Sequence, residues 1–368
     1  MSIITKQFAV SGAIFMLATA GQVQASCNPN VKPTNFEQFK RCVYQEPNTS
    51  VWIVDGDIPI TTEAGLRKFY EGLMASPTTP SALGSPSAEL IVNRVNNADD
   101  VWSDATRCSI RYCVSQATTG ARYQEVVNAM TAASNAWSNH IGVSITHVAN
   151  QDGNCTAQNA QVVFDVQVVN NQPYLARAFF PSDQRATRNI NINTTSFAVV
   201  QPPLTLEGIL RHELGHVLGF RHEHTRPETG QCFENNSWRP LTPYDSDSVM
   251  HYPQCGGTGD WGFNLTNNDI AGAVLLYGNQ ANCGSMVTIY QDASYSWVSK
   301  SLSVGNYDIN QLGISNDSLS SLKVPSGMKV TLYEHAGFQG KTLVITDDTV
   351  FVGDSFNDKT SSIKVESE

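Results

Sequence analysis

The chain has 368 residues, enough for two or three domains. Its formal net charge is −10 and its pI is about 5.3, so there is no general electrostatic reason to expect a nucleic-acid partner. Charged residues make up only 15% of the chain, which fits a globular extracellular protein better than a disordered one.

The first 25 residues predict a secretory signal peptide. Lys6 precedes an apolar run at residues 8–20, and Val-Gln-Ala at 23–25 has small residues where a signal peptidase cuts. The run is too short to span a membrane comfortably, and no other stretch approaches that length. We therefore expect a secreted protein with no membrane partner. A lipoprotein signal through Cys27 is the poorer alternative, because Gln24 stands where such signals carry an aliphatic residue.

Eight cysteines in a secreted chain predict disulfides. Proximity in sequence favours three local pairs, which are Cys27 with Cys42, Cys108 with Cys113, and Cys232 with Cys255. No CxxC pair occurs, so a structural zinc site built from thiolates is not expected.

Residues 26–94 predict a pro-segment. In order, it has an apolar run with two aspartates (52–59), a helix (63–74) and a Pro/Ser/Thr-rich stretch (76–87). The last stretch is typical of a linker open to proteases, and the basic Arg94 suggests processing nearby. The simplest interpretation of Asp55 and Gly56 is a turn between two strands.

Residues 95–278 predict a domain that mixes strands and helices. The periodicity of apolar residues predicts strands within 101–112 and at 143–148, 161–169, 176–181 and 188–193, and a helix at 123–139. A further helix begins near Thr205, and Thr266 with Asp269 forms a capping box that opens a closing helix.

The run HELGHVLGFRHEH begins at His212 and contains the candidate metal ligands and the candidate general base. His212 and His216 are four residues apart, so on a helix they share one face and can bind one zinc ion. Glu213 beside them can take a proton from a metal-bound water. His222 can reach the same metal only if the helix ends between His216 and His222, and Gly219 permits such a break. Three nitrogen ligands with open positions are typical of a catalytic zinc site.

This pattern, HExxHxxGxxH, resembles the metzincin signature, and Ser-Val-Met-His-Tyr at 248–252 looks like its Met-turn. His222-Glu223 with Met250-His251-Tyr252 resembles the astacin branch in particular. The resemblance implies an α+β metzincin catalytic domain with a mixed sheet, a zinc helix, a Met-turn and a C-terminal helix. It also implies that the strand at 176–181 is an edge that an extended peptide substrate could pair with.

The same resemblance implies roles for single residues. Tyr252 would be a further zinc ligand that swings away to stabilise the oxyanion, and Met250 would lie under the zinc site. Glu223 would contact the mature N-terminus, although it also fits a plain charge at a helix end. In astacin pro-segments an aromatic-x-Gly-Asp motif places its Asp on the zinc, and here that residue would be Asp57. Asp55 is a rival, since Val54 stands where the family carries an aromatic residue.

Beyond a linker at 279–285, residues 286–368 contain an internal repeat of about 40 residues. Val-Thr-Ile-Tyr at 287–290 matches Val-Thr-Leu-Tyr at 330–333. The repeat resembles a βγ-crystallin domain, an all-β sandwich of two Greek keys. In it, two hexapeptides would bind up to two calcium ions through Asn316, Asp317, Ser320, Asn357, Asp358 and Ser361.

A corner motif supports the second resemblance. Tyr333, Phe338 and Gly340 match the family pattern, whereas the first copy has Ser296 where Gly is expected.

We therefore expect a secreted, zinc-dependent metalloendopeptidase made as a zymogen. It would be a monomer that cuts protein or peptide substrates through a Glu213-assisted, zinc-bound water, after an activating protease removes the pro-segment. One alternative is a calcium-binding adhesin or matrix protein whose metzincin domain is silent, although the intact Glu213 argues against it. Another is a peptidase of a different metzincin branch, in which Tyr252 has no part.

Overall fold

The computed structural model describes residues 33–75, 89–280, 283, 286–325 and 328–367. The chain divides into two compact units. Unit 1 consists of Met1–Val101, Arg111–Trp137 and Thr146–Leu276, and unit 2 of Trp102–Ile110, Ser138–Ile145 and Tyr277–Glu368. Within the described ranges, no helix is both long enough and apolar enough to cross a membrane. The predicted signal peptide lies outside the described residues.

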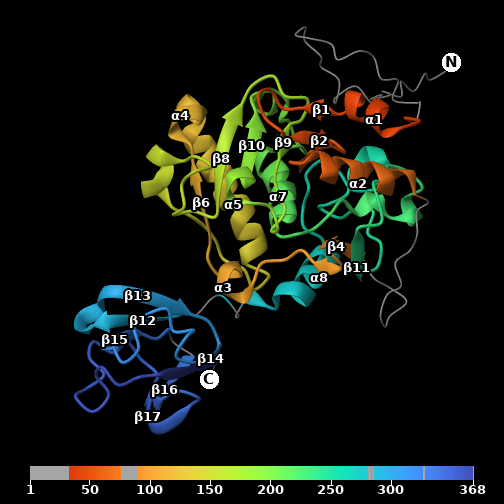
Figure 1. The fold of residues 1–368 in the computed structure, drawn as a ribbon. Helices are drawn as coiled ribbons and strands as arrows, with labels where there is room; N and C mark the ends of the chain where they lie inside the picture. The colour runs from red at the N-terminus through yellow and green to blue at the C-terminus, as the bar shows by residue number, and fades with distance from the viewer. Residues whose placement is uncertain (1–32, 76–88, 281–282, 284–285, 326–327, 368) are drawn as a thin grey trace, which may run out of the picture. The chain divides into compact units, whose positions relative to one another are not determined.

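The N-terminal segment, residues 33–75, is a small subdomain of unit 1 (Figure 1). Its elements are α1 (Phe36–Cys42), β1 (Tyr44–Gln45), β2 (Trp52–Val54), β3 (Ile58–Ile60) and α2 (Glu63–Met74). The helix α2 spans the predicted residues, because the Thr62 hydroxyl accepts from the Gly65 N–H and caps it. The apolar faces of these elements share a core with Phe180 from later in unit 1, so the segment is docked on the rest of the unit.

The central sheet has the strand order β7-β6-β8-β10-β9. Its strands are β6 (Ile110–Val114), β7 (Ile145–His147), β8 (Phe164–Val169), β9 (Ala176–Arg177) and β10 (Asn189–Asn193). The strands β6, β8 and β10 run parallel, and β9 is the antiparallel strand at one edge. Every predicted strand of this domain is therefore present, but each is shorter than predicted.

Two strand predictions are wrong in extent. The first strand does not begin at Val101, because α3 (Asp104–Arg107) forms there, with an ion pair between its first and last residues. The edge strand does not reach residue 181, because the Asp183 carboxylate accepts from the Phe180 N–H and closes a turn. Polar side chains that bond to nearby backbone groups compete with strand pairing in this way.

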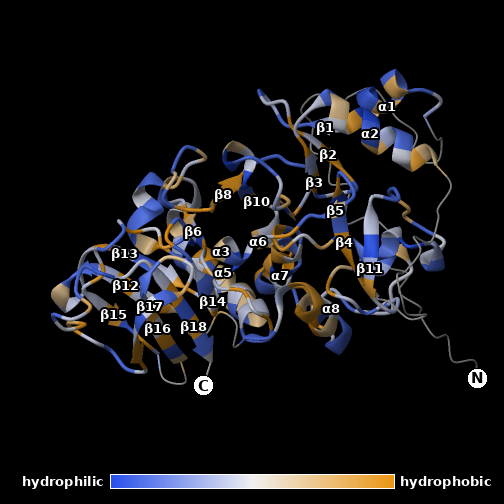
Figure 2. Cartoon of the chain, turned by 60° about the horizontal axis from the view of Figure 1, so that its bottom comes forward, coloured by the Kyte–Doolittle hydropathy of each residue, from blue (hydrophilic) through white to orange (hydrophobic). Residues whose placement is uncertain are grey.

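Two long helices, α5 (Tyr123–Ser138) and α7 (Leu206–Val217), contact each other beside this sheet (Figure 1). In α5 the predicted apolar face is fully buried. Its Trp137 donates to the carbonyl of Arg211 and stacks on Phe220, with ring centroids 5.4 Å apart. Figure 2 shows α7 and α8 (Asn267–Tyr277) largely in the hydrophobic colour.

The remaining helices of the described chain are short. The α-helices are α4 (Gln116–Thr119) and α6 (Ser196–Val199). The 3-10 helices are η1 (Gly120–Arg122), η2 (Ala149–Asn154), η3 (Arg185–Thr187), η4 (Glu223–Thr225), η5 (Pro227–Thr229), η6 (Pro253–Cys255) and η8 (Ala293–Tyr295).

A second sheet of unit 1 has the order β11-β4-β5. Its strands are β4 (Glu89–Val95), β5 (Ala98–Asp99) and β11 (Trp238–Thr242). The middle strand β4 carries three fully buried residues, Leu90, Ile91 and Val92. The predicted boundary between residues 94 and 95 therefore divides a paired strand, and a cut that leaves this sheet intact falls before Glu89.

The disulfides follow the fold more than the sequence spacing. Cys232 and Cys255 pair as predicted. The predicted pair of Cys108 and Cys113 is wrong, because Cys108 bonds to Cys283 and Cys113 to Cys155. The extended chain of β6 advances about 3.3 Å per residue, which carries Cys113 beyond the reach of a disulfide to Cys108. The predicted partner of Cys42, Cys27, lies outside the described residues.

The C-terminal part of unit 2 is all-β, with the strand orders β13-β12-β15 and β14-β18-β16-β17. The strands are β12 (Val287–Asp292), β13 (Ser296–Leu302), β14 (Gly305–Tyr307), β15 (Ser321–Lys323), β16 (Met328–His335), β17 (Gln339–Ile345) and β18 (Ser362–Ser367). The two predicted repeat strands begin β12 and lie within β16, and their buried residues share one core that includes Val287, Ile289, Val330 and Leu332.

The two corners of the repeat match, with one correction. Tyr333 and Phe338 contact edge to face, with centroids 5.8 Å apart, and Gly340 has φ +84. In the first copy Ser296 pairs with Asp292 as Gln339 pairs with His335, so the equivalent of Gly340 is Trp297 rather than Ser296. Trp297 has φ +66, a left-handed conformation that a side chain with a Cβ rarely adopts.

Candidate metal centre

The candidate centre begins where α7 ends. The helix stops at Val217, Gly219 has φ +91, and the Phe220 N–H donates to the carbonyl of Gly215 over 2.9 Å. This closure is a Schellman motif. A Cβ on Gly219 would also lie 2.1 Å from the carbonyl oxygen of Asp100. Two constraints therefore require glycine at this position, namely its backbone conformation and the lack of space for a side chain. The helix break also turns the chain, so that His222 returns to the helix.

The three predicted ligands meet at their Nε2 atoms. The Nε2 of His222 lies 3.2 Å from the Nε2 of His212 and 3.2 Å from that of His216. The Nδ1 atoms of His212 and His216 lie 2.7 Å and 2.8 Å from the carbonyls of Val249 and Phe220. Because a carbonyl can only accept, each of these Nδ1 atoms carries the proton, and each Nε2 presents a lone pair to the same point.

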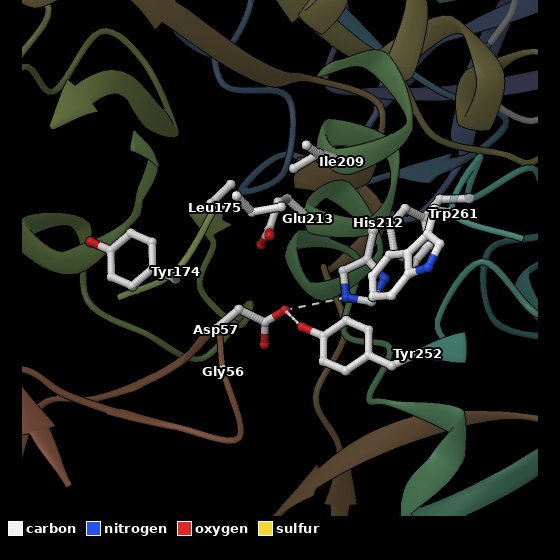
Figure 3. A pocket seen from close by; sticks show the side chains of 11 residues that line it. Gly56, Asp57, Tyr174, Leu175, Ile209, His212, Glu213, Tyr252 and Trp261 are labelled. Atoms are coloured by element: carbon white, nitrogen blue, oxygen red, sulfur yellow. Dashed lines mark hydrogen bonds and ion pairs between the residues drawn. The ribbon is translucent and has the colours of Figure 1, made fainter. Parts of the chain in front are cut away.

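Asp57 from the N-terminal segment faces that point. Its carboxylate oxygens lie 3.3 Å from the Nε2 of His212, 3.6 Å from that of His216 and 3.3 Å from that of His222. Burial opposes its ionisation, but interactions with the imidazoles, that of His222 first, outweigh burial and hold the pKa of Asp57 well below its usual range. Figure 3 shows this carboxylate facing both His212 and Tyr252, with a dashed line to each.

These residues fit a zinc ion. Asp57, His212, His216 and His222 are all buried, and their ligand atoms lie within 4.8 Å of one another. Lone pairs crowded together away from water are costly unless a cation lies among them. In addition, among the described residues no hydrogen-bond donor reaches Asp57 Oδ1. Imidazole nitrogens with one carboxylate form a donor set that zinc prefers.

Glu213 lies beside the three imidazoles and is buried. It lines a pocket with Asp57, His212 and Tyr252 (Figure 3). Burial, and then the charge of Asp57, raise the pKa of the Glu213 carboxyl well above its ordinary value. Within the described part of the chain, nothing donates a hydrogen bond to its Oε2. A carboxylate in this setting has a strong tendency to take up a proton.

The predicted Met-turn lies under the helix. A Cβ on Gly215 would lie 2.3 Å from Met250 Sδ, so the glycine makes room for the methionine. The turn is held by Asp269, which accepts from the Ser248 hydroxyl over 2.6 Å and from the Val249 N–H over 2.9 Å. The sequence predicted Asp269 only as part of a helix cap, which it also forms.

Tyr252 follows the turn and contacts Asp57 of the N-terminal segment. Its hydroxyl donates to Asp57 Oδ2, and its ring stacks on that of His212 with centroids 5.2 Å apart. Burial and the nearby charges of Asp57 and Glu213 raise the pKa of Tyr252 well above its usual value, so the hydroxyl keeps its proton and can donate.

A second group of residues, buried except for the partly exposed Asp55, surrounds the other nitrogen of His222. Its Nδ1 lies 2.8 Å from Glu234 Oε1 and 2.9 Å from Asp55 Oδ2, and Asp55 Oδ2 also lies 3.1 Å from His224 Nε2. Asp55, the predicted rival of Asp57, therefore lies on the opposite side of the imidazole. Glu234 was missed, because a lone glutamate twelve residues after a ligand has no recognisable pattern.

Glu223 is fully buried at the start of η4. Its N–H donates to the Met250 carbonyl over 2.9 Å, and its carboxylate accepts from the Asp245 N–H over 3.4 Å. The carboxylate also forms an ion pair with Arg226, with Nε 2.8 Å from Oε1. It thus links the third ligand to the Met-turn.

In unit 2 the two predicted hexapeptides lie together. The Ser361 hydroxyl of the second copy donates to Asp317 Oδ1 of the first over 2.9 Å. Asp317 and Asp358 have φ +53 and +55, and each accepts from the asparagine before it. The side-chain oxygens of the two motifs therefore gather at one surface. The residues involved are Asn316, Asp317, Ser320, Asn357, Asp358 and Ser361.

Comparison with known proteins gives a family match for part of the chain. The family described as "Dual-action HEIGH metallo-peptidase" matches residues 92–235, which is less than half of the chain. Zinc metalloproteinase nas-30 of Caenorhabditis elegans is 39% identical over 74 residues, covering 15% of this chain and 10% of that protein. Tolloid-like protein 1 of Homo sapiens is 41% identical over 64 residues, covering 12% of this chain and 6% of that protein.

Other matches concern a different kind of protein. Development-specific protein S of Myxococcus xanthus is 34% identical over 82 residues, covering 22% of this chain and 47% of that protein. A βγ-crystallin domain from Clostridium beijerinckii is 45% identical and covers 23% of this chain and 99% of that domain, with a TM-score of 0.22. The chain thus spans less than half the length of each of the three full proteins named.

These findings support a zinc metallopeptidase. More particularly, the family and sequence matches fit a metallopeptidase that carries a crystallin-type domain, the combination predicted from the two sequence motifs. They do not favour the alternative of a catalytically silent adhesin.

Proposed function

We propose that the chain is the zymogen of a secreted, astacin-like zinc endopeptidase. The observation that carries the proposal is the meeting of three imidazole Nε2 atoms at the carboxylate of a separate N-terminal segment. His212, His216 and His222 would hold the ion in a metzincin domain, and Asp57 would complete the set while the segment is present. Bound zinc supplies a Lewis acid that polarises a peptide carbonyl and acidifies water.

The chain's own residues supply the rest of the chemistry. The raised pKa of the Glu213 carboxyl suits a group that takes a proton from the attacking water and gives it to the leaving amine. The Tyr252 hydroxyl, freed from Asp57, would donate to the oxyanion of the tetrahedral intermediate. Met250 would fix the floor of the site without binding metal.

Latency would follow from the same contacts. The Asp57 carboxylate lies at the position that faces all three imidazoles, and it also accepts the hydrogen bond of the Tyr252 hydroxyl. A substrate carbonyl has no access to either until the segment leaves. We place the activating cut before Glu89, because β4 belongs to the enzyme's own sheet.

The C-terminal part of unit 2 would bind up to two calcium ions through its paired hexapeptides. Carboxylate, carbonyl and hydroxyl oxygens are the ligands that calcium prefers. The contact between Ser361 and Asp317 supports this, because it joins the two motifs into one cluster of oxygens. The module would then stabilise or target the enzyme.

The test follows cleavage of an unfolded protein by residues 26–368, with disulfides formed, before and after limited proteolysis. Activity should appear on trimming and vanish with a zinc chelator. Glu213→Ala should lower kcat by roughly 10²–10⁴-fold, the usual contribution of a general base. Zinc content should stay unchanged, since Glu213 is not among the candidate ligands.

The matched control is Glu228→Ala, which removes a half-exposed glutamate from the same part of unit 1 and should retain activity. If the trimmed, zinc-loaded chain cleaves no substrate while it remains folded, the proposal is wrong.

A further inference from the structure

The N-terminal segment places a second carboxylate in unit 1, away from the metal ligands. Glu46 follows β1 and is buried. Its Oε1 accepts from Arg177 Nε over 2.6 Å and from the Tyr174 hydroxyl over 2.6 Å, and its Oε2 accepts from Arg177 Nη2 over 2.9 Å. This is a two-pronged guanidinium–carboxylate pair with a phenol as the third donor, a strong and directional arrangement.

Arg177 belongs to the enzyme and is buried in the edge strand β9. Its remaining prong, Nη1, donates to Asn189 Oδ1 over 2.7 Å and so fixes the plane of the guanidinium. The Nε and Nη2 prongs are left pointing at Glu46. When the segment leaves, a buried guanidinium loses its carboxylate, which is unfavourable unless another anion takes the place.

The site adjoins the candidate active site. Tyr174 lines the same pocket as Asp57, His212 and Glu213, together with Leu175 and Ala176 (Figure 3). Among the described strands, β9 pairs only with β10. Its outer edge is therefore the place where an extended peptide could add as a further strand. An anchor at Arg177 would then lie along the bound peptide and close to the reacting bond.

Glu46 is presented on a hairpin turn, in the manner of a ligand. Its N–H donates to the carbonyl of Val51, and its carbonyl accepts from the Thr49 N–H. Val51 and Ile53 from the same hairpin pack on Tyr174. The hairpin therefore fills both the polar and the apolar parts of the site.

We propose that Arg177 and Tyr174 form a carboxylate-binding subsite of the processed enzyme, which selects peptides with an acidic group and which Glu46 occupies in the zymogen. This inference rests on the proposed peptidase function and on removal of the N-terminal segment. The acidic group is either an Asp or Glu side chain of the substrate or its C-terminal carboxylate, and the experiment separates the two.

The test measures kcat/KM of the trimmed enzyme on matched peptides. One set carries Glu or Gln at each position around the cut, and another carries a C-terminal acid or amide. At one position the acid should be preferred by roughly 10- to 100-fold, as expected for a charge-assisted hydrogen bond made or lost. Preference for Glu over Gln indicates a side-chain subsite, and preference for the free acid over the amide indicates a terminal one.

Arg177→Met should reduce this preference to within about twofold, because it removes both prongs while keeping most of the side-chain volume. Tyr174→Phe should reduce the preference only in part, since it removes one hydroxyl and leaves the guanidinium. Arg111→Met, which removes an exposed cation from β6, is the matched control and should leave the preference intact.

If the trimmed wild-type enzyme cleaves acid and neutral peptides equally well, the subsite inference is wrong and the peptidase proposal stands. If it cleaves neither, the peptidase proposal itself fails. Should Arg177→Met not fold, Tyr174→Phe decides the matter, because an unchanged acid preference in that variant excludes the tyrosine from the subsite.

Discussion

The two units build their candidate sites in opposite ways. In unit 2 equivalent contacts recur in the two copies, as shown by the N–H groups of Ser320 and Ser361, which donate to the carbonyls of Tyr290 and Tyr333. In unit 1 each group around the imidazoles occurs once and comes from a distant part of the chain, as Asp57 and Glu234 do. A repeated site tolerates the loss of one copy, whereas a site assembled once depends on every member.

This difference between a repeated site and a site formed once also determines how much of each site can be predicted from the sequence. The contacts of a repeated site can be recognised in the sequence, because the same residue types recur at equivalent positions of the two copies. The residues that hold a site formed only once can be recognised only where a sequence motif includes them. The following experiments compare the two units on these terms, from the largest expected effect to the smallest.

Tyr252→Phe should lower kcat of the trimmed enzyme about 100-fold, because one oxyanion contact contributes roughly 3 kcal/mol. Zinc content, measured by elemental analysis, should not change. Tyr307→Phe removes the same atom from unit 2 and should leave kcat unaltered. Full turnover by Tyr252→Phe would rule out the astacin-like assignment in favour of another metzincin branch.

Asp269 should make the stability of unit 1 depend on pH. Burial raises the pKa of this carboxyl to about 6, above its value in the unfolded chain. Its contribution is therefore complete below about pH 4 and lost as the pH rises through 6, a change of order 2–3 kcal/mol.

The measurement is denaturant unfolding of wild type and Asp269→Asn from pH 4 to 7. The wild type should lose more stability over this range than the variant, which has no titrating group at this position. If the free energy of unfolding changes with pH equally in wild type and Asp269→Asn, the prediction is wrong.

Glu234→Gln should weaken zinc binding about 10- to 100-fold, because it removes the carboxylate that accepts from the Nδ1 of a ligand. The loss should be greater in the trimmed chain, where Asp55 no longer supports the same nitrogen. Competition with a chelator measures both forms, and Glu228→Gln is the exposed control. Equal zinc affinity of Glu234→Gln and wild type would remove Glu234 from the site.

Calcium should stabilise unit 2 by about 1.4 kcal/mol for each ion bound, at a concentration tenfold above its Kd. Asp317→Asn and Asp358→Asn should each abolish one binding event, and the double variant both. Calorimetry of calcium binding and of unfolding checks this. Zinc content should be unaffected throughout. If calcium produces no binding heat and no change in the unfolding of the wild type, the proposed calcium sites are wrong.

The sequence predicted the elements that local chemistry determines. The cap at Thr205, the break at Gly219 and the capping box at Thr266 all depend on residues within one turn, and all are present. It failed for the Cys108 pairing, where distant segments decide the partner, and for the length of the edge strand, which a turn between Phe180 and Asp183 ends. Asp55 was placed only as a rival of Asp57 for the metal, and Glu46 and Glu234 were not placed, because a single carboxylate carries no pattern until the fold supplies its partner.

The strand β4 has a consequence for how the mature protein begins. It lies in the middle of its sheet and has hydrogen-bonded neighbours on both edges. A protease that enters before Glu89 can shorten the new end only as far as this strand, because paired and buried backbone resists cleavage. Proteases of quite different specificity should therefore converge on nearly the same first residue. On the proposed processing, the architecture of the sheet would define the new N-terminus, and one activating protease could replace another.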